Sequence, residues 1–323
     1  MRYTHAIVVR IPNSVKLDDK KANVDFAVAS KQLDDLSETL REAGVDVVEL
    51  SPQDDCTQQS LYVDDAAVVI NGTALITRPK KAGSRIHEIT SVLEELSWQV
   101  IEAPANDHGK PVVLEGSDVL FTGKEIFVGT RKNGTNMEGA MVVGRTFSDL
   151  AVIPIALPGA DPLKHYVSLV STEVLAVGSS KEAKLVLQRI EREATFRYKT
   201  LTVEYDEAVS CFNVNDHIIY RQDTPDTRFQ VLQEPLQVWG VTMSELVKLG
   251  NPATRFCLLV KKMKALKSLC DVTSVHRQLD NRSAGAPRQA IRIAFPKSPS
   301  HTSQQDKTRS EQDYNKEVYQ SGW

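Results

Sequence analysis

The sequence lacks the features that mark several classes of protein. No apolar run reaches the roughly 18 residues that a membrane-spanning helix needs, so we expect no membrane partner. The four cysteines, Cys56, Cys211, Cys257 and Cys270, are scattered without a CxxC pair, which favours reduced thiols over a zinc or disulfide framework. The first residues start on a strand pattern without a signal-peptide core. We therefore expect a cytoplasmic protein.

Excess positive charge is also missing. The chain has 39 Lys and Arg against 42 Asp and Glu, a formal net charge of −3. A nucleic-acid-binding protein normally presents a basic face, so we expect no nucleic-acid partner. We also expect no cofactor and no metal, and the sequence leaves both a monomer and a dimer open. A chain of 323 residues can bury one large core or two smaller ones.

The strongest local signal is a hairpin centred on Asn71-Gly72. Runs of β-forming residues lie on both sides of this pair, which supplies the two positive-φ residues of a tight turn. Two adjacent carboxylates, Asp64 and Asp65, enter the first strand, and Arg78 and Arg85 follow the second. Carboxylates at one end and guanidinium groups at the other would suit a small zwitterionic ligand.

The pattern of hairpin, helix and strand recurs along the chain. Further hairpins are expected at 118–128, 165–178 and 209–220, each followed by a helix and another strand. A spacing of roughly 45 to 50 residues is typical of repeat architectures such as propellers. About five ββαβ units fit, the first and last sharing the chain ends, and closing them in a ring removes exposed sheet edges. An open α/β sandwich is the alternative.

The composition changes beyond Leu269. Residues 283–323 are rich in polar residues and proline and contain one apolar island, at 290–295. Such a segment lacks the apolar content to fold alone. We therefore expect an α/β propeller domain at 1–269 and a disordered polar tail at 270–323.

Several ordered runs resemble the dimethylarginine dimethylaminohydrolase family, which is part of the pentein or guanidine-modifying superfamily. The similarity covers most of residues 2–262. It rests on the runs Thr4-His-Ala-Ile-Val-Val-Arg-Ile-Pro12, Val63-Asp-Asp-Ala-Ala-Val-Val69, Thr73-Ala-Leu-Ile-Thr-Arg-Pro79, Gly116-Ser-Asp-Val-Leu-Phe-Thr-Gly123, Phe127-Val-Gly129, Val177-Gly-Ser-Ser180 and Val241-Thr-Met-Ser-Glu-Leu246. The resemblance implies a five-bladed α/β propeller of ββαβ repeats with pseudo-fivefold symmetry and an active site on the central axis.

The resemblance also implies hydrolysis of Nω-methylated arginine to citrulline and a methylamine. Such chemistry needs carboxylates that hold the guanidinium, a cysteine thiolate that attacks its carbon, and a histidine that protonates the leaving amine and activates water. The ligand would be a small guanidino compound or amino acid. The family's substrate-binding positions fall on Asp64, Asp65, Gln59, Arg85 and Gly134, with Arg131 three residues before the last.

The two positions that carry the family's chemistry hold other residues. The run 161–165 reads Asp-Pro-Leu-Lys-His and places Pro162 at the histidine, while Arg255 stands at the nucleophilic cysteine. Proline has no imidazole and cannot transfer a proton. His165 and Cys257 are the nearest substitutes. A two-residue shift along a strand moves a side chain about 7 Å, whereas reaction geometry tolerates errors of about 1 Å.

Three interpretations follow. The chain is a dimethylargininase-type C–N hydrolase that uses His165 and Cys257, or a hydrolase without a thiol on an altered substrate. The third is a pseudoenzyme that binds a guanidino or amino-acid ligand or acts as an interaction scaffold. In that case Arg255 would pair with Asp64 or Asp65, or bind an anion. If neither substitute has a role, His165 lies on a strand surface and Cys257 in the core.

Overall fold

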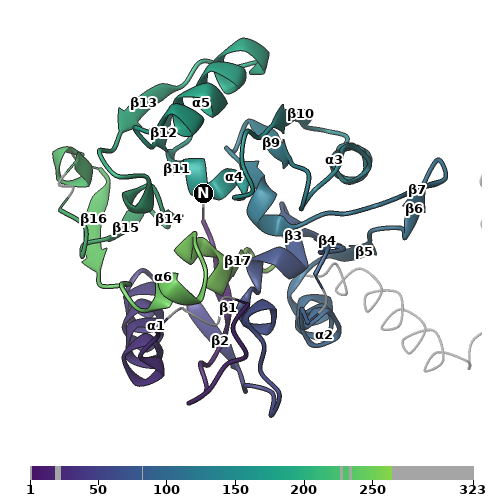
Figure 1. The fold of residues 1–323 in the computed structure, drawn as a ribbon. Coiled ribbons are helices and arrows are strands. Elements are labelled where there is room, and N and C mark those ends of the chain that lie inside the picture. Colours follow the sequence, from purple (N-terminus) through teal and green to yellow (C-terminus); the bar gives the residue numbers. More distant parts are fainter. Residues whose placement is uncertain (1, 19–22, 82, 226–227, 233–234, 264–323) are drawn as a thin grey trace, which may run out of the picture. The chain divides into compact units, whose positions relative to one another are not determined.

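One arrangement of strands repeats five times in the chain (Figure 1). The computed structural model describes residues 2–18, 23–81, 83–225, 228–232 and 235–263, all within the unit Met1–Ala265. Each repeat is a three-stranded sheet in which the middle strand pairs antiparallel with the inner strand and parallel with the outer strand. The predicted boundary at 269 and the predicted tail lie outside the described residues.

Each sheet has an inner, a middle and an outer strand, in that order. They are β17 (Cys257–Val260), β1 (His5–Val9) and β2 (Asp46–Leu50); β3 (Ala67–Ile70), β4 (Thr73–Ile76) and β5 (Gln99–Glu102); β8 (Val119–Phe121), β9 (Glu125–Thr130) and β10 (Ala151–Ala156); β11 (Val167–Ser171), β12 (Val174–Val177) and β13 (Lys199–Thr202); and β14 (Cys211–Val214), β15 (His217–Arg221) and β16 (Gln237–Val241). A short arm, β6 (Asn106–Asp107) and β7 (Lys110–Pro111), follows β5.

The first sheet joins both ends of the repeat region. Strand β17 pairs antiparallel with β1 from His5↔Val260 to Val8↔Cys257. The last inner strand therefore completes the sheet that the first strand begins, and the ring closes. This confirms the five-bladed α/β propeller of ββαβ repeats and excludes the open sandwich.

Helices connect the middle and outer strands in four of the five repeats. They are α1 (Phe26–Glu42), α2 (Ile86–Leu96), α3 (Met137–Thr146) and α5 (Lys181–Glu193). In the fifth repeat, the described residues at this point form a 3-10 turn, η5 (Arg228–Val231). A four-residue helix, α6 (Leu246–Leu249), lies between β16 and β17.

Local sequence explains why these helices form and face inward. In α1, the Asp25 carboxylate caps the first turn by accepting hydrogen bonds from two backbone amides. Leu33, Leu36 and Leu40 recur at helical spacing and are buried against the sheets. Among the described residues, no helix is long and apolar enough to cross a bilayer.

A short helical turn precedes every inner strand. The turns are η2 (Asp64–Ala66), η3 (Gly116–Asp118), α4 (Leu163–Tyr166), η4 (Asp206–Ala208) and η6 (Ala253–Phe256). Neighbouring turns contact one another, η2 with η3 and η6, and α4 with η3 and η4. The five inner strands therefore begin at the same end of the ring, and polar side chains on the turns meet there.

Candidate functional site

The two adjacent carboxylates on η2 have different partners. Asp64 accepts hydrogen bonds from Lys164 Nζ at 2.9 and 2.7 Å. Asp65 Oδ2 accepts hydrogen bonds from Arg255 Nε at 2.9 Å and Nη2 at 2.6 Å, and its Oδ1 accepts one from the Ser117 amide at 3.0 Å. Both carboxylates are buried, so each of the predicted ligand-binding acids already holds a cation from the protein itself.

The Arg255 guanidinium lies between a carboxylate and an aromatic ring. Its Cζ is 4.1 Å from the centre of the Tyr62 ring, and its Nη2 is 3.8 Å from the Glu115 carboxylate. The Tyr62 hydroxyl is itself held, because it donates to the Leu249 carbonyl at 2.7 Å. A carboxylate edge and an aromatic face are the groups that suit a planar guanidinium. Arg255 supplies that guanidinium here.

The ion pairs change the acidity of their members. Burial raises the pKa of Asp65. The Arg255 guanidinium and the Ser117 hydrogen bonds lower this pKa by more than burial raises it, so it lies below its usual value. Burial lowers the pKa of Arg255, but the Asp65 charge raises it more. Burial raises the pKa of Asp64 despite the opposing Lys164 charge. Asp65 and Arg255 therefore favour each other's charged form.

A second ion-pair group lies beside Arg255. Arg131 Nε donates to both oxygens of the Asp118 carboxylate at 3.1 Å, and its Nη2 donates to the Glu115 carboxylate. Its Nη1 donates to the Ala160 carbonyl at 2.7 Å. Burial raises the pKa values of Glu115 and Asp118, and Arg131 opposes the rise in both.

Arg131 fills the space beside the family's arginine position. A Cβ added at Gly134 would lie 2.3 Å from Arg131 Cζ, so the guanidinium stands where a side chain at 134 would begin. Its three nitrogens hydrogen-bond to groups of the protein. The expected contact of Arg131 with a ligand carboxylate stays a prediction, and it would compete with these bonds.

Gln59 and Arg85 are buried and hydrogen-bond to partners outside the acidic pair. Gln59 Nε2 donates to the Asp18 carboxylate at 2.7 Å. Arg85 Nη1 donates to the Ser51 carbonyl at 2.5 Å, and its Nη2 pairs with Glu88. Neither side chain hydrogen-bonds to the acidic pair on η2. The expected contacts of Gln59 and Arg85 with a ligand stay predictions, and each would compete with these bonds.

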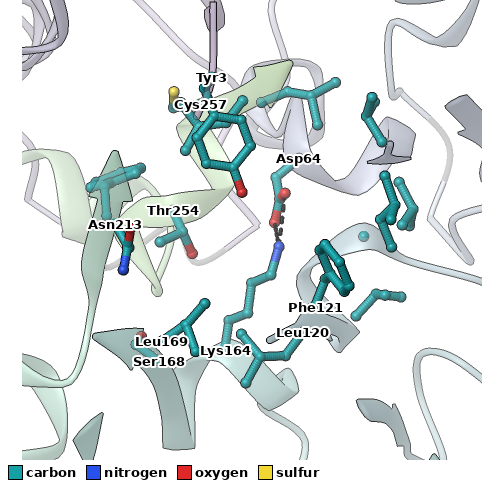
Figure 2. Close-up of a pocket in the computed structure, with 18 of the residues that line it drawn as sticks. Tyr3, Asp64, Leu120, Phe121, Lys164, Ser168, Leu169, Asn213, Thr254 and Cys257 are labelled. Carbon is teal, nitrogen blue, oxygen red and sulfur yellow. Dashed lines mark hydrogen bonds and ion pairs between the residues drawn. The ribbon is translucent and has the colours of Figure 1, made fainter. Parts of the chain in front are cut away.

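Cys257 is one of the residues around a cavity on the ring axis (Figure 2). It is the first residue of β17, is buried, and lines this cavity together with Asp64, Lys164 and Cys211. Burial raises the pKa of the Cys257 thiol, and the Asp64 charge raises it further. The thiolate is the nucleophilic form of cysteine, so this environment disfavours attack by Cys257. The described residues that line the cavity include no histidine.

The histidine substitute lies on a helical turn. Pro162 is the N-cap of α4, and His165 is in the last turn of that helix, so its expected place on a strand is wrong. This turn precedes β11 in the same way that a short helical turn precedes the inner strand of every other repeat. His165 Nδ1 is 2.9 Å from Asn251 Nδ2, and its ring packs edge-on against Tyr166. The structure does not bring His165 and Cys257 into contact.

Three residues that shape the site were absent from the sequence-based prediction. They are Tyr62, Glu115 and Lys164, which contact Arg255 or Asp64. Each lies on or next to a short turn that precedes an inner strand, and this shared position is the signal that could have identified them. Among the described residues, no group of three or more His, Cys, Asp and Glu side chains could hold a metal ion.

Comparison with known proteins identifies the relatives of the chain. A scan against protein-family models gives no match. The putative hydrolase DDAH2 of Bos taurus is 29% identical over 277 residues, which cover 80% of this chain and 95% of the relative. The N(G),N(G)-dimethylarginine dimethylaminohydrolase of Streptomyces coelicolor is 36% identical over 139 residues, which cover 43% of this chain and 52% of the relative.

Solved structures share the fold. A cysteine-to-serine mutant of dimethylarginine dimethylaminohydrolase from Pseudomonas aeruginosa, complexed with citrulline, has a TM-score of 0.63 and 21% identity over 80% of this chain and 100% of that one. The N-terminal domain of the cyanobacterial arginine dihydrolase ArgZ, bound to substrate, has a TM-score of 0.62 and 18% identity over 80% and 98%. In sequence and in fold the chain is similar to the dimethylarginine dimethylaminohydrolase family.

Proposed function

We propose that this chain is a non-catalytic member of its family whose guanidinium position is occupied by its own Arg255. The observation that supports this most directly is the paired hydrogen bonding of Arg255 to Asp65 at the face of the Tyr62 ring. By the family resemblance, residue 255 stands at the nucleophile. A guanidinium is charged at all physiological pH values and has no nucleophilic lone pair to offer.

The proton-transfer position supports the same proposal. Residue 162 stands at the family's histidine, and proline offers neither an imidazole nor an N–H. The nearest imidazole, on His165, lies beside Asn251. A nucleophile and its base need to be within about 3 Å of each other or bridged by one water. Cys257 lines the axial cavity and His165 does not, so the described lining of this cavity offers Cys257 no imidazole that could act as its base.

A free guanidino ligand would have to displace Arg255. Asp65 already holds two hydrogen bonds from this side chain, and its remaining oxygen accepts from Ser117. We therefore propose that arginine, methylated arginine and citrulline bind weakly to the wild-type chain and are not converted. The function left to such a protein is non-hydrolytic, in ligand sensing or as an interaction scaffold.

The test is citrulline release from dimethylarginine and from arginine by the purified full chain at high enzyme concentration. The Cys257→Ser variant is assayed beside it. We expect no release above the heat-inactivated protein in either case. Release by the wild type that Cys257→Ser abolishes would establish a rearranged thiol hydrolase instead. Release by both proteins would establish a hydrolase without a thiol, and either result overturns the proposal.

A further inference from the structure

The ring axis contains a cavity that the Arg255 site does not use. Its volume is about 140 Å³, and residues of all five inner strands line it. The Asp64–Lys164 ion pair crosses it, and the Tyr3 hydroxyl points toward this pair (Figure 2). Thr254 Oγ1 is buried at the cavity without a hydrogen-bond partner among the described residues.

The cavity continues toward the far end of the inner strands. A second hollow of about 90 Å³ shares Tyr3, Val69, Ile70 and Phe121 with it. Ile70 and Phe121 are the last residues of β3 and β8, whereas the turns that carry Asp65 and Arg255 precede their strands. The hollow is therefore a mouth at the end of the ring opposite to the Asp65–Arg255 pair. We refer to the cavity and this mouth together as the axial funnel.

The mouth and the walls of the axial funnel differ in character. Exposed Arg2 and Lys261 line the mouth, with Asn71 between the strands of the second sheet. The side chains between the mouth and the ion pair are mostly apolar: Val69, Val119, Phe121, Leu169, Phe212 and Leu259. Deeper in, the Asp64 carboxylate is neutralised by Lys164, so the floor carries no unpaired charge of either sign.

We propose that the axial funnel binds a short-chain carboxylate. The carboxylate lies at the mouth, where Arg2 and Lys261 attract an anion and repel an amine of the same length. The hydrocarbon chain extends between the apolar walls toward the ion pair. This site is separate from the guanidinium position, so it does not depend on whether the chain is a hydrolase.

The length of the hydrocarbon chain is what the cavity selects. Burial of each further methylene group contributes about 0.8 kcal/mol, which corresponds to about a fourfold gain in affinity. The gain stops where the chain meets the Asp64–Lys164 pair, because a longer chain would have to displace a buried ion pair. Affinity is therefore expected to rise from acetate to butyrate, and to level off or fall once the hydrocarbon chain is long enough to reach this pair.

Calorimetry and ligand-observed NMR with acetate, butyrate, hexanoate and butylamine on the full chain test the proposal. We expect butyrate to bind at least tenfold more tightly than acetate, and butylamine not to bind. The double variant Arg2→Gln/Lys261→Gln should lose at least tenfold in butyrate affinity. Lys262→Gln, an exposed neighbour that does not line the mouth, is the matched control and should bind butyrate as the wild type does.

A wall variant tests the path of the hydrocarbon chain. Val69 is half-buried and lines both the cavity and the mouth, so Val69→Phe narrows the funnel where the two meet. It should weaken hexanoate more than acetate, with unchanged circular dichroism. The proposal is overturned if no carboxylate binds, if butylamine binds as well as butyrate, or if the mouth variant and Lys262→Gln have equal effects.

Discussion

Arg255 and Asp65 form a buried ion pair whose members depend on each other. The Arg255 side chain is 16% exposed and that of Asp65 is 4% exposed, so solvent screens the pair little. Removal of one member leaves a buried charge without its partner, which typically costs about 3 to 5 kcal/mol. The two side chains therefore act as one unit in the stability of the ring end.

A double-mutant cycle measures this dependence. We expect Arg255→Ala and Asp65→Asn each to lower the free energy of unfolding in urea by about 3 to 5 kcal/mol. The double variant should lose clearly less than the sum of the single losses. Arg41→Ala serves as control, because its pair with Glu49 at 2.6 Å is more exposed and should contribute about 1 kcal/mol or less. Additive losses at 65 and 255 would contradict a coupled pair.

The low pKa of Asp65 predicts how stability depends on pH. A carboxyl whose pKa is lower in the folded state contributes stability above its unfolded pKa of about 3.9 and loses it as pH falls through the folded value. The wild type should therefore exceed Asp65→Asn in unfolding free energy by a constant amount above pH of about 5. Urea titrations at lower pH should show this difference shrinking. A difference that grows on acidification would contradict the assignment.

The sequence identified the acids but not their partners. Asp64 and Asp65 stand in a recognisable motif that enters a hairpin strand, so a local pattern was sufficient to select them. Their cations are separated from them by 100 and 190 positions, at Lys164 and Arg255. Only the closed ring brings these residues together, and local propensity carries no information about such pairs.

At the scale of elements, the short turns before the inner strands need close backbone contact. A Cβ added at Gly116 in η3 would lie 1.8 Å from the Asp64 carbonyl oxygen in η2. Backbone atoms cannot yield as a flexible side chain can. The two turns that carry Asp65 and its Ser117 amide donor can therefore approach this closely only because residue 116 has no side chain.

This contact predicts opposite effects for two glycine substitutions. Gly116→Ala should destabilise the chain by at least about 2 kcal/mol, because it pushes η2 and η3 apart. Gly144→Ala, in α3, meets no atom closer than 3.9 Å and should be neutral or stabilise by up to about 1 kcal/mol through helix propensity. Thermal and urea unfolding of both variants give the comparison. Equal effects would mean that η2 and η3 do not depend on their close approach.

Elements with strong local signals were predictable, and those set by tertiary contacts were not. The Asn71-Gly72 turn has φ values of 50° and 84°, as the hairpin signal requires. Between β15 and β16 the described residues form only the 3-10 turn η5, and Pro225 and Pro235 restrict the backbone on either side of it. His165 was assigned to a strand because apolar residues follow it, whereas the repeat imposes a turn before each inner strand.

At the scale of the whole molecule, the ring is closed by pairing between residues far apart in the chain. Thr4 donates to the Val260 carbonyl across 256 positions, and β17 supplies the inner strand of the first sheet. The spacing of the hairpins was enough to predict five repeats. It could not decide between a ring and an open sheet, because closure depends on this single long-range pairing.

Truncated chains test the role of closure. A chain that ends at residue 265 keeps β17 and should retain the cooperative unfolding of the full chain. A chain that ends at Phe256 lacks β17, leaves β1 without its antiparallel partner, and should lose cooperative unfolding. Circular dichroism during heating distinguishes the two. Loss of the transition in the longer truncation would show that residues beyond 265 are required for the fold.

The central claim is that Arg255 provides the guanidinium that Asp65 and Tyr62 are arranged to hold. Its most direct test is to return a guanidinium from solution to the Arg255→Ala variant. Each kcal/mol of binding raises the midpoint of unfolding by about 2 to 4 °C in a chain of this size. We predict that low millimolar methylguanidinium raises the midpoint of Arg255→Ala by at least this amount. Sodium chloride at equal ionic strength should not raise the midpoint of Arg255→Ala. Methylguanidinium should not raise the midpoint of the wild type or of Arg255→Ala/Asp65→Asn. No rise in Arg255→Ala, or an equal rise in all three proteins, would contradict the claim.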